Sequence, residues 1–270
     1  MKFEIIEQKG NTLRFKLSDS SPAFANALRR LLYEVPTLAI DEVIVIENSS
    51  LLYDEILAHR LGQVPLVTPP DTFIERHLCS CDGHGCTNCE VSLTLDKEGT
   101  TLGGIETVYS GDLESEDPEV RPVIDTLPLL RFTANNKVVL QAIARLGRAS
   151  QHAKFQSAVC SYKYEPIITI DREKSASCQE LVEICPKKVF VFEDNKLKVT
   201  DPLKCTLCNW CIENIPEEGA VTITTTGKDF IFNLESIGQI GANRLLITAL
   251  KLLKDKAQEA STKVYELAVV

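Results

Sequence analysis

The 270-residue chain carries ten cysteines, and their spacing is its clearest chemical signal. Three of them, Cys205, Cys208 and Cys211, recur every third residue and are followed by Pro216. Thiolates in the run C-x2-C-x2-C-x3-C-P hold an iron–sulfur cluster, but Ile215 stands here where the fourth cysteine is expected. The missing ligand must therefore come from elsewhere in the chain.

A second, degenerate copy of the same run lies upstream, in the stretch SASCQELVEICPKKVF. It ends in Cys185 and Pro186, and its first three ligand positions fall on Ser175, Cys178 and Leu181. In ferredoxins with two clusters, the fourth cysteine of each run ligates the cluster that the other run holds. We therefore expect one complete site, made by Cys185 with Cys205, Cys208 and Cys211. The second site keeps a single thiol, Cys178, and is expected to be lost.

The complete site suits one 4Fe–4S cluster, or a 3Fe–4S cluster if Cys185 does not ligate. The alternative is a zinc ribbon on the same four cysteines, although zinc sites usually use paired C-x2-C knuckles. Cys178 is then a spare buried thiol or a disulfide partner. Cys160, alone in an apolar segment, is expected in the core.

Another cysteine group occupies a short loop with two glycines, Gly83 and Gly85. Its four thiols fall within eleven residues of sequence: Cys79, Cys81, Cys86 and Cys89. A structural zinc ion is one interpretation, although the C-x-C pair is tighter than the usual knuckle. One or two disulfides, or thiols without a metal, are the alternatives. His77 and His84 flank the loop and are expected to be bystanders.

Composition narrows the class of protein. The net charge is −9, from 29 Lys and Arg against 38 Asp and Glu. Because a protein that grips a phosphate backbone is usually basic, we expect no strong direct binding to nucleic acid. No apolar run reaches the ~20 residues of a membrane span, and the amino-terminal segment has no signal-peptide core, so we expect a cytoplasmic protein without membrane contact.

Two long helices are expected from the apolar pattern. Residues 22–35 carry apolar side chains at helical spacing and precede Pro36, which stops the helix. Residues 233–261 carry apolar side chains over so wide an arc that the helix must bury two sides, within one core or against a partner chain. Residues 96–122 are polar and rich in turn residues and predict a surface excursion. The chain lacks an Asp-rich triplet that could hold two magnesium ions for phosphoryl transfer, so no catalytic residues for that reaction are expected.

Two stretches carry a family likeness. FANALRRLLYEVPTLAIDEVIVIENSSLLYDEILAHRLGQVPL and GRASQHAKFQSA resemble the assembly-subunit family of cellular DNA-directed RNA polymerases, which includes the bacterial alpha subunit and the eukaryotic third-largest subunit. The ferredoxin-like insert is similar to that of the archaeal members. The resemblance covers nearly the whole chain and implies a scaffold for transcription. The competing hypothesis is a ferredoxin-type electron-transfer or redox-sensing subunit.

The resemblance implies an α+β fold with three parts. A dimerisation domain would be formed by residues 1–40 and 223–270, a mainly-β inserted domain by 41–170, and a ferredoxin-like iron–sulfur domain by 171–222. The dimerisation domain would pair with a small alpha-like subunit, L, and this platform would bind subunits N and P and the large catalytic subunits. The expected interface residues are Phe24, Leu28, Arg29, Arg30, Leu31, Leu246, Leu250 and Leu253. In eukaryotic members the position of the 79–89 loop carries zinc.

Overall fold

A computed structural model describes residues 1–99, 104–194, 196–214 and 217–268 of the chain. The predicted α+β class is confirmed, since short antiparallel sheets alternate with few helices. The helices are α1 (Pro22–Tyr33), α2 (Asp54–Gly62), α3 (Leu181–Ile184), α4 (Trp210–Glu213) and α5 (Ala242–Ala268). The strands are β1 (Lys2–Lys9), β2 (Thr12–Ser18), β3 (Thr37–Asn48), β4 (Glu90–Glu98), β5 (Glu106–Tyr109), β6 (Glu114–Ser115), β7 (Pro128–Phe132), β8 (Lys137–Gly147), β9 (Ala158–Tyr164), β10 (Ile167–Ile170), β11 (Phe190–Glu193), β12 (Lys196–Val199), β13 (Val221–Thr224) and β14 (Phe230–Ser236).

The first sheet is assembled from both ends of the chain, with its strands in the order β1-β2-β14-β9. Alternate residues of β2 are buried, as expected for a strand with one face on a core. Phe15 of β2 stacks on Phe232 of β14, with ring centroids 4.8 Å apart and planes 5° from parallel. This aromatic contact joins residues more than two hundred positions apart in sequence.

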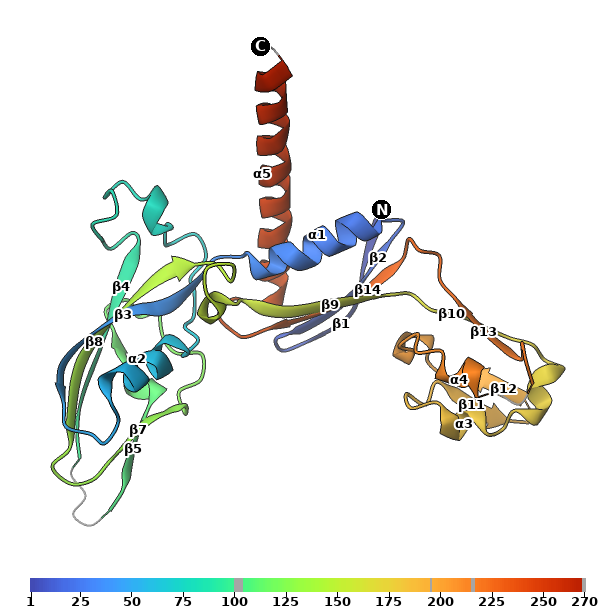
Figure 1. The fold of residues 1–270 in the computed structure, drawn as a ribbon, viewed down its shortest axis with the longest axis horizontal. Helices are drawn as coiled ribbons and strands as arrows, with labels where there is room; N and C mark the ends of the chain where they lie inside the picture. The colour runs from blue at the N-terminus through green and yellow to red at the C-terminus, as the bar shows by residue number, and fades with distance from the viewer. Residues whose placement is uncertain (100–103, 195, 215–216, 269–270) are drawn as a thin grey trace. The chain divides into compact units, whose positions relative to one another are not determined.

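The second sheet is antiparallel, with the order β3-β8-β4-β6. β8 pairs with β3 on one side and β4 on the other, and α2 lies beside these strands (Figure 1). Its core includes alternate residues of β8 and the helix residues Leu57 and Leu61. The predicted surface excursion at 96–122 was wrong in its described part, because Val108, Leu113 and Val120 belong to this core. Their apolar side chains are spaced too irregularly among polar residues to give a periodic signal.

Residues 171–222 contain the antiparallel hairpin of β11 and β12 together with the short helices α3 and α4 (Figure 1). β10 leads into this segment and pairs antiparallel with β13, which leads out of it. Four of the insert's five cysteines are buried among Leu181, Phe190 and Val221 in one small core: Cys178, Cys185, Cys205 and Cys211. The segment is too small to have a large apolar core of its own.

The C-terminal helix begins later than predicted. The sequence pattern places Ile237 and Ile240 in the helix, but β14 continues to Ser236 and α5 starts at Ala242. Gly238 has φ +109°, a backbone conformation that neither a strand nor a helix adopts, so it lies in the turn between β14 and α5. The three-residue spacing of these isoleucines therefore reflects a turn. None of the described helices is long and apolar enough to cross a membrane.

The chain divides into two compact units. One comprises Met1–Glu7, Arg14–Asn26 and Ser161–Asn233, and the other comprises Gln8–Leu13, Ala27–Cys160 and Leu234–Val270. The division into three domains, at 1–40 with 223–270, 41–170 and 171–222, stays a prediction.

Gly147 closes β8 and opens the motif GRASQHAKFQSA. A Cβ atom on it would lie 2.6 Å from ring carbons of Phe155, whose side chain is buried. We expect Gly147→Ala to lower the free energy of unfolding by about 1–3 kcal/mol, because the packed ring has no free space to enter. Urea denaturation measures the change. Gly62→Ala in α2 is the control, since its methyl would stand 3.5 Å from the Ile40 carbonyl oxygen. Equal effects of the two substitutions would contradict the prediction.

Candidate metal centres

The 79–89 loop connects the 3-10 turn η1 (Arg76–Leu78) to β4. Its backbone folds back on itself through three residues with positive φ, Asp82 at 52°, Gly83 at 81° and Gly85 at 92°. A side chain at Gly85 would also collide with the Glu90 carboxylate, since a Cβ would lie 2.3 Å from Oε1. The two glycines are therefore needed for the shape of this loop.

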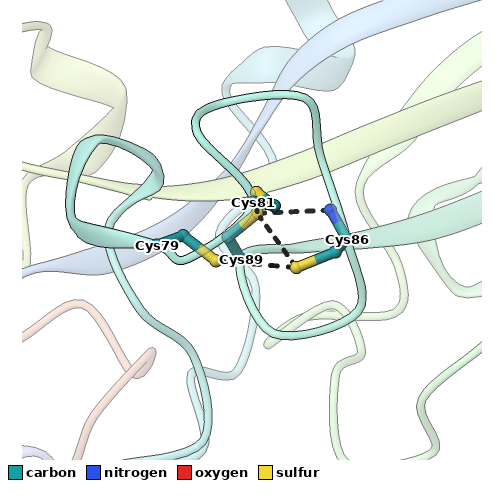
Figure 2. Close-up of side chains that lie close together, drawn as sticks. All are labelled: Cys79, Cys81, Cys86 and Cys89. Atoms are coloured by element: carbon teal, nitrogen blue, oxygen red, sulfur yellow. Dashed lines mark hydrogen bonds between the residues drawn. The ribbon is translucent and has the colours of Figure 1, made fainter.

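The four loop sulfurs gather around one point (Figure 2). Cys79 Sγ lies 3.5 Å from Cys86 Sγ, and Cys89 Sγ lies 3.7 Å from Cys81 Sγ and 3.8 Å from Cys86 Sγ. All four sulfurs lie within 4.8 Å of one another. A tetrahedral zinc site with Zn–S bonds of ~2.3 Å has sulfurs about 3.8 Å apart. A disulfide needs ~2.0 Å, so the loop geometry fits a single ion better than disulfides.

The thiols of this loop differ in acidity. Burial opposes ionisation of Cys81, but hydrogen bonds from the Gly85 backbone and from neighbouring thiols outweigh it and lower the pKa of Cys81 to about 6. Burial raises the pKa of Cys89 to about 12. At neutral pH a metal would therefore bind Cys81 as a thiolate, whereas it would have to displace a proton from Cys89.

Charged side chains hold the loop at both ends. Arg148 forms a forked ion pair with Glu75, whose side chain is largely buried just before the loop. Arg145 Nε donates to Glu90 Oε2 at 3.1 Å, just after the loop. Arg76 Nε donates to the Gly83 carbonyl at 2.7 Å, across its middle. His77 and His84 are not among the side chains that gather with the four sulfurs.

The insert holds the second cysteine group. Cys185 follows α3, Cys205 follows the 3-10 turn η5 (Pro202–Lys204), and Cys211 lies in α4. These three thiols are buried, whereas Cys208 is exposed. All four line one cavity, whose other walls include Val189, Phe190 and Ile223. The fold thus brings the distant Cys185 to the three cysteines of the C-x2-C-x2-C run.

The four insert thiols influence one another electrostatically. All four belong to the described residues, in which the loop cysteines form the one group of side chains close enough to hold a single ion. Burial raises the pKa of Cys211 to about 11, and the charges of the other three thiols add to this rise. They are therefore close enough to interact around the cavity that all four line. This arrangement fits a multi-iron cluster.

The backbone of the C-x2-C-x2-C run is shaped for sulfur ligation. The Leu207 N–H donates to Cys205 Sγ at 3.5 Å, and hydrogen bonds to sulfur are a standard feature of iron–sulfur sites. Leu207 and Asn209 have φ of 58° and 59°, so the chain reverses sharply between successive cysteines. Such non-glycine conformations are costly and persist where surrounding structure enforces them.

The second cluster site is expected to be lost, and its three described positions are buried. Ser175, Cys178 and Leu181 are 3%, 0% and 0% exposed, and Cys178 and Leu181 belong to the insert core. The fourth position, Ile215, lies outside the described residues. A leucine at the third position offers no thiolate, so the described part of this site has the Cys178 thiol alone, and the loss of the site stays a prediction. Cys160 is also buried, and burial raises its pKa to about 12, as suits a core thiol.

The residues predicted at the partner interface differ in how far their side chains are exposed. Leu28, Leu31 and Leu246 are buried within the chain itself. Phe24, Arg29 and Leu253 are half-buried, and Arg30 and Leu250 are exposed. The first three are therefore core residues of this chain.

Three residues at the two centres were not predicted from the sequence, namely Glu75, Arg148 and Lys163. Arg148 pairs with Glu75 near the loop, and Lys163 of β9 contacts the backbone beside Cys205. Burial lowers the pKa of Lys163, although the Cys205 thiol acts in the opposite direction. Arg148 belongs to the quoted GRASQHAKFQSA motif and could have been singled out there. Nothing in the spacing marks Glu75 or Lys163.

Comparison of the sequence with known proteins shows which class of protein this chain belongs to. Residues 43–172 match the family model of the RNA polymerase Rpb3/RpoA insert domain. The chain is 38% identical to DNA-directed RNA polymerase subunit Rpo3 of Archaeoglobus fulgidus, over 98% of this chain and 98% of that protein. It is 38% identical to the Rpo3 subunit of Methanosphaera stadtmanae, over 95% and 96% of the two chains. The Rpo3 subunit of Methanosarcina acetivorans is 39% identical, over 96% of each chain.

The chain therefore belongs to the archaeal Rpo3 family of DNA-directed RNA polymerase subunits. The predicted family is confirmed over nearly the full length, including the cysteine-bearing insert.

Proposed function

We propose that this chain is a non-catalytic assembly subunit of a DNA-directed RNA polymerase. It would pair with the small alpha-like subunit L and form the platform on which subunits N and P and the large catalytic subunits assemble. The full-length similarity to Rpo3 subunits carries this proposal. Contacts to nucleic acid would be made mainly by other subunits, because this chain has a net charge of −9.

The exposed surface of α5 supports a partner on this helix. Its carboxyl-terminal half is exposed, including the apolar residues Val264, Tyr265 and Leu267 at 65%, 71% and 79%. Further back, Ile247 and Leu250 are 49% and 39% exposed. A long helix gains most of its stability from packing of an apolar face, so α5 needs a neighbour.

Both cysteine groups would serve this scaffold as structural centres. Zinc would be held by Cys79, Cys81, Cys86 and Cys89, and one iron–sulfur cluster by Cys185, Cys205, Cys208 and Cys211. A bound metal centre links chain segments that have few apolar contacts of their own, because its binding free energy is also folding free energy.

Pairing with subunit L tests the proposal. We expect Leu250→Glu to weaken co-purification of co-expressed L by about tenfold or more, because a carboxylate would be buried in an apolar contact. Lys251→Glu, at the exposed neighbouring position, is the matched control and should leave pairing intact. Size-exclusion chromatography of the purified complex gives the readout. Wild-type chain that never pairs with L would overturn the proposed assembly role.

A further inference from the structure

Lys163 lies on β9 and reaches the ligand-bearing loop of the insert. Its Nζ donates to the Leu203 carbonyl oxygen at 2.5 Å and to the Cys205 carbonyl oxygen at 2.5 Å. These acceptors are 40 and 42 residues away in sequence and flank the end of turn η5. The Lys163 ammonium therefore fixes the backbone on both sides of Lys204, immediately before and at Cys205, the first cysteine of the C-x2-C-x2-C run.

The surroundings of Lys163 differ from those of an ordinary surface lysine. Its side chain is half-buried, and both of its hydrogen bonds go to neutral carbonyls. A half-buried ammonium loses hydration, and neutral carbonyls compensate for that loss only in part. Asp201 contributes a negative charge, but Arg14 and Lys187 oppose its effect, so further negative charge would complete the compensation. Four thiolates around a cluster would supply it, and the Cys205 backbone that Lys163 holds carries one of them.

We propose that Lys163 is a positioning residue for the iron–sulfur site, which holds the Cys205 loop in place and offsets the negative charge of the ligated cluster. This inference rests on the proposed cluster at Cys185, Cys205, Cys208 and Cys211. Lys163 would act through the protein backbone, in the way that outer residues of metal sites orient ligands and tune the metal. A neighbouring positive charge also favours the reduced, more negative state of a cluster.

The test compares lysine variants of the full chain, reconstituted anaerobically with iron and sulfide and co-expressed with subunit L. Lys163→Met removes the charge and both hydrogen bonds. Lys204→Met is the matched control, because Lys204 is exposed and lies between the two carbonyls that Lys163 holds. Lys163→Arg keeps the charge and the donors. The measurements are iron content, the rate of iron release to a chelator, and the reduction potential from a titration followed by EPR.

We expect Lys163→Met to release iron about tenfold faster than wild type and to shift the reduction potential to more negative values. Lys204→Met should match wild type in release rate, and Lys163→Arg should recover most of the loss. If Lys163→Met does not fold, Lys163→Gln, which keeps one donor without the charge, should still show the negative shift in potential.

Two failures can be told apart. Wild-type protein that binds iron, with Lys163→Met equal to it in release rate and potential, would overturn the role of Lys163 alone. Wild-type protein that takes up no iron would overturn the cluster and the Lys163 inference together. The proposed charge compensation would also be contradicted if Lys163→Met released iron faster without a shift in reduction potential, and Lys163→Arg released iron just as fast.

Discussion

Replacing Cys185 by serine is expected to lower the iron content from about four per chain to three or fewer. Cys185 comes from the upstream run, yet it lines the same cavity as Cys205, Cys208 and Cys211. A hydroxyl is a poor ligand for iron in a cubane, so the variant should give a three-iron EPR signal or lose the cluster. Iron and sulfide analysis after anaerobic purification with subunit L measures the change.

Cys178→Ser provides the control for that experiment. Cys178 is equally buried in the insert core, and its Sγ donates to the Lys174 carbonyl oxygen at 3.4 Å, a bond that a serine hydroxyl can also make. This variant should keep its full iron content. Equal iron in both variants, or zinc in place of iron, would contradict the crossed ligation. Cluster-free Cys185→Ser that still pairs normally with L would exclude a redox-sensing role in assembly.

Replacing Cys89 by serine is expected to abolish zinc binding by the 79–89 loop. Cys89 is the loop cysteine with no exposed surface, and its Sγ also accepts from the Cys86 N–H at 3.3 Å. Structural zinc sites in small peptides bind with roughly 10–16 kcal/mol, and loss of one thiolate removes much of that. Zinc content should fall from about one per chain to near zero. The melting temperature should drop by several degrees, since that binding energy is folding energy.

His84→Ala controls for the zinc experiment, because His84 is exposed and lies in the same loop without joining the sulfur group. It should retain the metal. Zinc affinity should also fall as the pH is lowered, because protons compete for the thiolates. The pKa of Cys89, at about 12, means that binding at neutral pH releases at least its proton. Zinc retention in Cys89→Ser, or zinc loss in His84→Ala, would contradict the assigned ligands.

The cysteine ligands were the part of the two candidate sites that could be predicted from the sequence, because their spacing is informative. Ligands of one loop must lie a few residues apart, so Cys79 to Cys89 and Cys205 to Cys211 could be grouped directly. Cys185 could be added because the ferredoxin run pairs two copies in a known crossed manner. Lys163 and Glu75 could not be found, because their partners lie 40 or more residues away and no short motif records such contacts.

The periodicity of apolar residues predicted that the two long helices exist more reliably than it predicted where each helix begins and ends. The helix starting at Pro22 was correctly expected from its apolar stripe, and the Ser21 hydroxyl caps this helix by accepting from the Phe24 N–H. The start of α5 was misplaced because Ile237 and Ile240 repeat at a helical interval in a turn. The apolar residues Val108 and Leu113 were missed because polar neighbours hid their burial.

The sheet built from both chain ends has a consequence for biosynthesis. β2 is complete at Ser18, but its neighbour β14 begins only at Phe230. At roughly 5–20 residues per second, a ribosome needs roughly 10–40 s to cover that distance. Throughout that interval β2 can pair only with β1, because the strand on its other side has not yet been made. The sheet of β3, β8 and β4, whose residues end at Gly147, can fold well before the β1-β2-β14-β9 sheet closes.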